Sequence, residues 1–208
     1  MDMDLDISPI IVPESLENLK LPSPELLQYY DNTNNRIIWI DDEIGDQMLS
    51  YSKNIIKWNM EDRDIPVEER KPIKIMIFSI GGSLYACNHF IDIIEMSKTP
   101  VYGYNVGMAL SAAFMILIAC HKKYCTRTST ALIHQGSSSI SGNATDVLNG
   151  VKNYTVQLKE IRDYILKKTK IGSKLYNTKL KEDWYLTAED QVKYGVVDGI
   201  INNIEDLM

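Results

Sequence analysis

Ser111 stands among small residues, where an apparent strand meets an almost wholly apolar segment. The run from Val106 to Cys120 is otherwise apolar, so the presence of a hydroxyl group inside it requires a structural or functional explanation. A serine oxygen attacks a carbonyl carbon only where a base can take its proton. In the first turn of a buried helix, a serine would also lie near unpaired N–H groups and the positive end of the helix dipole. Ser111 is therefore a candidate nucleophile, and a serine that binds its own helix backbone is the alternative.

Two further segments carry the groups that such a serine needs. His134 ends a short apolar run, and an imidazole at a strand end can act as a general base near neutral pH. Asp183 comes shortly before an expected helix cap at Thr187, and its carboxylate would hold the second imidazole nitrogen. Each could instead be an ordinary loop side chain with a backbone or water partner. The competing histidines and acids are His89, His121, Asp146 and Glu182.

Gly81 and Gly82 follow an expected strand and precede an expected helix. Without side chains in the way, their backbone N–H groups could join the N–H of Ala112 in an oxyanion hole, which stabilises the negative oxygen of a tetrahedral intermediate. The alternative is a plain turn that requires positive φ. A phosphate-binding loop is disfavoured, because the further glycine and the lysine of such a loop are missing.

An alternating series of strands and helices must position these residues. Residues 84–96, for example, show apolar side chains at helical spacing. The expected strands are 36–40, 73–80, 101–106, 123–128, 130–134 and 196–201. The expected helices are 46–60, 84–96, 108–120, 146–170 and 189–194, and polar loops are expected at 61–72 and 137–142. This alternation predicts an α/β fold with parallel strand pairing and helices layered on the sheet.

The first part of the chain has a different composition. Three prolines lie among acidic and amide residues, and Asp31–Asn35 is a strong turn or loop signal. We interpret residues 1–35 as an arm that is partly disordered or docks on a partner subunit. Residues 36–208 are then expected to form one domain.

Bulk composition excludes several classes of protein. The 208 residues are 45% hydrophobic and 24% charged, with a net charge of −6, so neither nucleic acid nor an anionic membrane surface is an expected partner. The acidic N-terminus lacks the order of a signal peptide, and the longest apolar run is shorter than the about 20 residues of a membrane span. Cys87, Cys120 and Cys125 have no metal-type spacing, so we expect no metal, no cofactor and no disulfide framework. The expected compartment is a reducing cytoplasm.

Five segments, in this order along the chain, resemble motifs of the proteolytic subunit of the Clp protease, a serine peptidase. They are Phe78–Ser83, Gly107–Ala112, Leu132–Gln135, Gly142–Asp146 and Asp183–Glu189, the last continuing into Tyr194–Asp198. The resemblance covers about residues 36–201. Ile80 and Gly136 stand where the family usually has proline, and Glu182 stands where it usually has arginine. The chain thus resembles a divergent, phage-type member of the family.

The resemblance implies the ClpP/crotonase-like α/β fold, a spiral of ββα units with a protruding handle helix at about 146–170. It implies Ser111 as nucleophile, His134 as general base and Asp183 as the orienting acid. The backbone N–H groups of Gly82 and Ala112 would be the oxyanion donors. Family members form heptameric rings that stack into a closed chamber, into which an ATPase ring feeds unfolded chains.

We therefore expect a homo-oligomeric serine endopeptidase of the ATP-dependent proteolysis class. Its peptidase core would need no ATP itself, and an AAA+ ATPase is the candidate partner. It would hydrolyse peptides or unfolded proteins through an acyl-enzyme on Ser111. Two alternatives stay open: a ring scaffold without catalytic activity, and an acyl-CoA enzyme of the crotonase type.

Overall fold

The computed structural model of the protein describes residues 22–207, so most of the expected arm lies outside the described residues. The described helices are α2 (Pro24–Asn34), α3 (Gln47–Glu61), η1 (Val67–Glu69), α4 (Leu84–Met96), α5 (Ala112–Ala119), α6 (Ala144–Lys168), α7 (Ser173–Lys179), α8 (Ala188–Lys193) and η2 (Ile204–Leu207). The strands are β1 (Ile37–Ile40), β2 (Ile73–Ser79), β3 (Val101–Leu110), β4 (Lys122–Thr126), β5 (Thr130–Ile133), β6 (Trp184–Leu186) and β7 (Gly199–Ile201).

All seven strands belong to one sheet, in which β1, β2, β3, β4 and β7 lie side by side and pair in parallel. On the side away from β2, the long strand β3 has two partners: its first half pairs with β4, and its second half pairs in parallel with β5. Strand β6 then adds to β5 in the antiparallel direction. The mixed α/β fold with parallel strands expected from the sequence is therefore confirmed.

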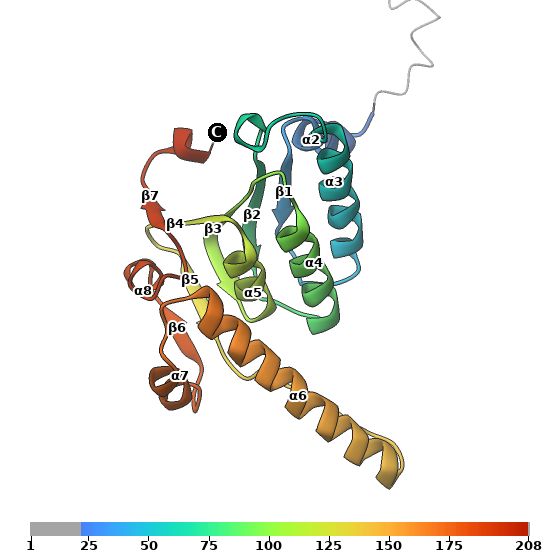
Figure 1. The fold of residues 1–208 in the computed structure, drawn as a ribbon, viewed down its shortest axis with the longest axis vertical. Coiled ribbons are helices and arrows are strands. Elements are labelled where there is room, and N and C mark those ends of the chain that lie inside the picture. Colours follow the sequence, from blue (N-terminus) through green and yellow to red (C-terminus); the bar gives the residue numbers. More distant parts are fainter. Residues whose placement is uncertain (1–21, 208) are drawn as a thin grey trace, which may run out of the picture.

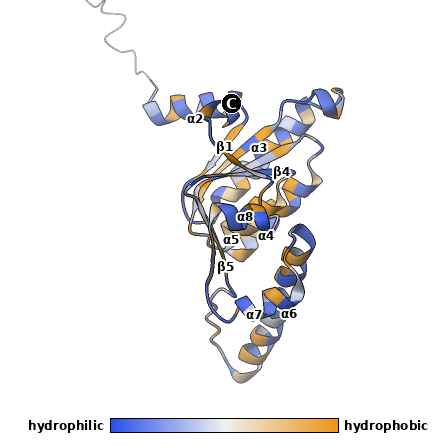
Figure 2. Cartoon of the chain, turned by 90° about the vertical axis from the view of Figure 1, so that its left-hand side faces the viewer, coloured by the Kyte–Doolittle hydropathy of each residue, from blue (hydrophilic) through white to orange (hydrophobic). Residues whose placement is uncertain are grey.

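Helices α3, α4 and α5 cover one face of this sheet (Figures 1 and 2). All eight residues of α5 are buried, which is why its sequence is apolar on every side. Phe90 of α4 and Phe114 of α5 are among the largest fully buried side chains in the core between helices and sheet. A rigid core thus supports the carboxyl ends of the parallel strands.

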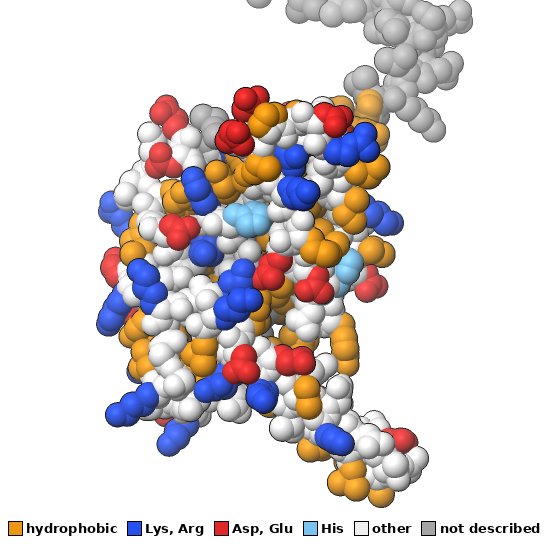
Figure 3. All heavy atoms as spheres, in the orientation of Figure 1, with side chains coloured by type: hydrophobic (Ala, Val, Ile, Leu, Met, Phe, Trp, Pro, Cys, Tyr) orange, Lys and Arg blue, Asp and Glu red, His pale blue; other side chains and the backbone are white. Residues whose placement is uncertain are grey.

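Helix α6 projects away from this body (Figure 1). Its 25 residues span about 37 Å at 1.5 Å per residue. Ile165, close to its C-terminal end, is its only buried residue, whereas Leu148 and Val151 in its outer half are exposed. Figure 3 shows apolar side chains at the protruding end, while Lys and Arg are interspersed with Asp and Glu over the visible face of the body.

The polar segment before β1 differs from the expectation. Asp31–Asn35 carries a loop signal, yet α2 runs through Asn34. The polar side chains support the end of the helix: the Thr33 hydroxyl donates to the carbonyl of Tyr29 at 2.8 Å, and the Asn35 side chain donates to the carbonyl of Asp31 at 3.1 Å. The same residue types that favour turns can also donate side-chain hydrogen bonds to backbone carbonyls in the last turns of a helix.

Candidate active site

Ser111 lies at the junction of β3 and α5. The sequence predicted a helix beginning at residue 108, and this was wrong, because β3 continues to Leu110. Ser111 has φ 57° and ψ −119°, a conformation that side-chain-bearing residues rarely adopt. Its N–H donates to the carbonyl of Leu132 at 3.1 Å, which ties the turn to β5. Backbone strain of this kind is concentrated at functional sites.

The registers of three strands bring the candidate side chains together. Leu110 of β3 is level with Leu132 of the parallel strand β5. Because parallel strands end at the same edge of a sheet, the residues that follow β3 and β5 meet there. The antiparallel strand β6 places Trp184 opposite Ile133, so the residue before β6 lies next to the residue after β5.

His134 is in hydrogen-bond contact with the serine. Its Nε2 atom lies 2.8 Å from Oγ of Ser111, a normal hydrogen-bond distance. Its Nδ1 atom lies 3.5 Å from Oδ1 of Asp183, which is longer than a normal hydrogen bond. The side chain of Asp183 is 56% exposed and that of His134 28% exposed. The structure therefore brings all three residues together, with a tighter serine–histidine contact than histidine–aspartate contact.

Gly82 and Ala112 present N–H groups next to this cluster. Ile44 donates its N–H to the carbonyl of Gly81 and accepts from the N–H of Ser83, both at 2.8 Å. In such a parallel bridge the N–H of the middle residue, Gly82, points to the opposite side. Ala112 is the first residue of α5, where backbone N–H groups have no partner within the helix. Among the described residues, neither N–H has a hydrogen-bond acceptor.

Gly81 allows these two segments to touch. A Cβ atom at this position would lie 2.6 Å from the carbonyl oxygen of Leu110 and 2.7 Å from Cβ of Ser111. Its φ of 97° is also one that residues with side chains rarely adopt. The Gly81–Gly82 pair thus lies where the backbone of its loop approaches the turn at Ser111.

The competing residues have other roles or positions. Nδ1 of His121 accepts the N–H of Val101 at 2.8 Å, and burial lowers the pKa of this imidazole. His89 is exposed on α4, and Glu182 is exposed in the loop before β6. Asp146 lies in the first turn of α6, where its N–H is capped by Asn143 at 3.1 Å. None of these four lines the cleft described next.

A cleft of about 660 Å³ opens at Ser111 and His134. Its apolar wall comes from α5, β5 and the inner part of α6, and a polar wall comes from the middle of α6 and the loop after His134. The apolar lining includes Phe114, Met115, Leu132, Ile161 and Ile165, and the polar lining includes Asn153, Tyr154 and Gln157. A cleft of this size and mixed lining suits a peptide segment.

The loop after His134 rests on α6, a contact that the sequence did not predict. The Tyr154 hydroxyl donates to the carbonyl of Gln135 at 2.9 Å. The next residue, Gly136, has φ 72°, in the left-handed region that favours glycine. In the sequence Tyr154 is one of several apolar positions at helical spacing, so its hydroxyl partner left no local signal.

Within residues 22–207 no group of three or more His, Cys, Asp or Glu side chains could hold a metal ion. The three cysteines are buried, and burial raises the pKa of both Cys87 and Cys120 to about 12. Thiols with so high a pKa are poor metal ligands, because the thiolate is the binding form. In the same part of the chain no helix has the length and apolar content needed to cross a membrane.

The chain is similar to proteins of one known family. The family model described as Clp protease matches residues 26–204. ATP-dependent Clp protease proteolytic subunit 2 of Treponema denticola is 34% identical over 139 residues, which cover 66% of this chain and 70% of that protein. ATP-dependent Clp protease proteolytic subunit 1 of Bacillus cereus is 27% identical over 193 residues, which cover 91% of this chain and 97% of that protein. With its parallel sheet and projecting helix, the chain belongs to the Clp protease family.

Proposed function

We propose that this protein is a serine endopeptidase that hydrolyses peptide bonds through an acyl-enzyme on Ser111. The observation that carries the proposal is the 2.8 Å contact between Nε2 of His134 and Oγ of Ser111, at the mouth of a peptide-sized cleft. A serine oxygen that already has an imidazole within hydrogen-bond reach has its general base in place.

The chemistry follows from this contact. Neutral His134 accepts the Oγ proton at Nε2 while Oγ forms a bond to the carbonyl carbon and the carbonyl electrons move onto its oxygen. When the C=O bond re-forms, the C–N bond breaks, and the imidazolium gives its proton to the leaving amine. Water then repeats both steps on the ester, which releases the acid and restores Ser111.

The backbone N–H groups of Gly82 and Ala112 are the proposed donors to the negative oxygen of the tetrahedral intermediates. Such donors are effective because they are held in place before the charge develops. Asp183 would hold the Nδ1–H tautomer of His134 and stabilise the imidazolium. Its carboxylate is partly exposed, so its pairing with His134 is screened by water.

The relatives are named proteolytic subunits of an ATP-dependent protease. For this chain we propose, accordingly, a homo-oligomeric ring that encloses the sites and works with an AAA+ ATPase. The exposed apolar side chains Leu148, Val151 and Val156 on α6 support a contact between copies, since apolar patches on a projecting element mark interaction surfaces.

Labelling with a fluorophosphonate tests the proposal, because this reagent reacts with an activated serine oxygen. The assembled wild-type protein should be labelled at Ser111 and should cleave a fluorogenic peptide. Ser111→Ala should lose both properties while keeping its assembly state. Ser138→Ala is the matched control, because Ser138 also lines the cleft but has no histidine partner among the described residues. An assembled protein that is neither labelled nor active would instead support the inactive scaffold.

A further inference from the structure

Glu43 lies next to Gly82 and lines the cleft that holds Ser111 and His134. It belongs to the loop between β1 and α3, one residue before Ile44, which forms the backbone bridge to Gly82. A Cβ atom at Gly82 would lie 2.7 Å from Cγ of Glu43. The stem of the Glu43 side chain therefore packs against Gly82 on the side that faces Ile44. The residue also lines the same cleft as Ser111 and His134.

The charge of Glu43 has no counterpart in this cleft. Among the described residues that line it, Glu43 is the only aspartate, glutamate, lysine or arginine. Within residues 22–207 it also forms no ion pair. The neighbouring carboxylate of Asp42 accepts the N–H of Glu43 at 2.7 Å, so the local field at this lip of the cleft is negative.

Negative charge at this edge of the cleft disfavours the tetrahedral intermediate of the proposed reaction. The tetrahedral intermediate would carry its negative charge next to the N–H of Gly82, and a carboxylate in the same cleft opposes that charge. A cationic side chain of the substrate, placed beside Glu43, would offset this repulsion and would gain attraction as well. The apolar wall of the cleft disfavours a charged group, so an apolar side chain of the substrate should lie against it. The cationic side chain should then belong to a neighbouring residue of the substrate.

From this geometry we infer that Glu43 is a specificity-determining residue, which selects peptides with a lysine or arginine close to the scissile bond. The inference rests on the proposed peptidase function and names its substrate class. Because the Glu43 side chain is exposed, the preference should be modest, about 3- to 5-fold in kcat/KM, and should fall with added salt.

A set of fluorogenic peptides tests the inference. Each peptide carries leucine before the scissile bond and either arginine or citrulline, its neutral isostere, at one of the flanking positions. Wild-type enzyme should prefer arginine at one position by about 3- to 5-fold, and Glu43→Gln should reduce this ratio to about 1. Glu68→Gln is the control, because Glu68 is exposed before β2, at the opposite end of that strand from Gly82. This variant should keep the wild-type ratio.

Two results would overturn this inference without affecting the proposed function. One is an equal rate of hydrolysis for the arginine and citrulline peptides of every pair, and the other is an arginine preference that Glu43→Gln retains. In both cases the peptides are cleaved and Ser111 is labelled, so the proposed function stands. A protein that cleaves no peptide and takes up no fluorophosphonate overturns the proposed function, and with it this inference.

Discussion

The Nδ1 atom of His134 lies 3.5 Å from Oδ1 of Asp183, whereas Nε2 of the same ring lies 2.8 Å from Oγ of Ser111. The histidine thus lies close to the proposed nucleophile and farther from a carboxylate that is half exposed to water. This difference predicts that removing the Ser111 hydroxyl lowers activity more than removing the Asp183 carboxylate.

Ser111→Ala should lower kcat/KM at least about 1,000-fold, whereas Asp183→Asn should lower it about 100-fold or less. Without the carboxylate, His134 can still act as a base through water-mediated support of its ring. The measurement is the rate of peptide hydrolysis by the two variants, compared in samples that have the same oligomeric state. Equal losses in the two variants would show that Asp183 controls the histidine more strongly than its distance suggests.

The backbone of Ser111 leads to a prediction about stability. With φ 57°, Ser111 occupies a region that is costly for a residue with a Cβ atom and mild for glycine. Both Ser111→Gly and Ser111→Ala remove the hydroxyl, yet the glycine variant should be more stable by about 1 kcal/mol. Urea unfolding of the two inactive variants measures the difference. A more stable alanine variant would mean that this turn stores no strain.

The sequence predicted the regular elements better than the junctions between them. Helix α4 has the predicted bounds, because its apolar residues recur at helical spacing between a serine cap and a polar end. The junction at Ser111 was misplaced, since the run from Val106 to Cys120 is apolar apart from Ser111 and has no period that separates strand from helix. Pairing of the end of β3 with β5 decides the boundary, and that contact is not local.

For the candidate site, too, the sequence predicted the individual residues better than the contacts between them. Residue type and local setting indicated Ser111, His134 and Asp183 one by one. Their proximity depends on the pairing of β5 with β6, and β6 is a strand of three residues with no periodic pattern to reveal it. The resemblance to a family implied the grouping, which spacing alone did not.

Tyr154 should affect substrate binding more than chemistry. Its hydroxyl donates to the carbonyl of Gln135 at 2.9 Å and so holds the loop after His134, which is one wall of the cleft. Tyr154→Phe removes only this hydrogen bond, and KM should rise about 3-fold with a smaller change in kcat. Steady-state kinetics separates the two constants. Tyr29→Phe, on α2, is the control and should change neither; a fall in kcat alone for Tyr154→Phe would contradict the assignment.

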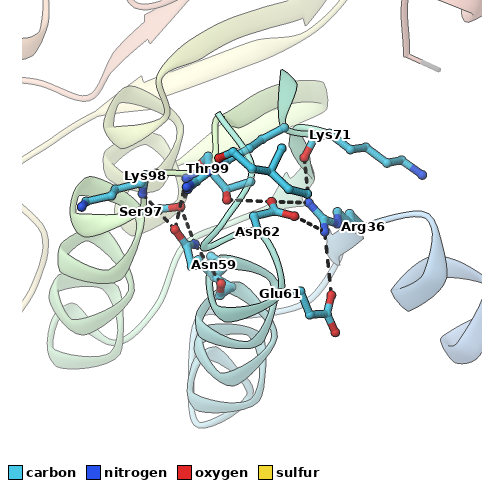
Figure 4. A network of polar contacts seen from close by, with 11 residues as sticks. Arg36, Asn59, Glu61, Asp62, Lys71, Ser97, Lys98 and Thr99 are labelled. Carbon is cyan, nitrogen blue, oxygen red and sulfur yellow. Dashed lines mark hydrogen bonds and ion pairs between the residues drawn. The ribbon is translucent and has the colours of Figure 1, made fainter. Parts of the chain in front are cut away.

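Asp62 anchors a polar network at the other end of the sheet (Figure 4). Its carboxylate, 2% exposed, accepts two hydrogen bonds from Arg36, at 2.6 and 2.7 Å, and one from the hydroxyl of Thr99 at 2.8 Å. The hydrogen bonds from Arg36 are the main reason why the pKa of Asp62 lies below its ordinary value. Asp62→Asn leaves the largely buried guanidinium of Arg36 with only the half-exposed carboxylate of Glu61, 3.8 Å away, as a partner charge. The free energy of unfolding should therefore fall by about 3 kcal/mol at neutral pH.

The pH dependence of this loss has a defined sign. Because the pKa of Asp62 is lower in the folded protein than in the unfolded chain, its contribution is complete above about pH 4 and is lost as the pH falls through the folded-state pKa. The difference in unfolding free energy between wild type and Asp62→Asn should therefore narrow in acid. Urea titrations at neutral and acidic pH measure it, with the exposed Asp64→Asn as the control that changes little at either pH. A difference that stays constant with pH would contradict a role for the ionised carboxylate.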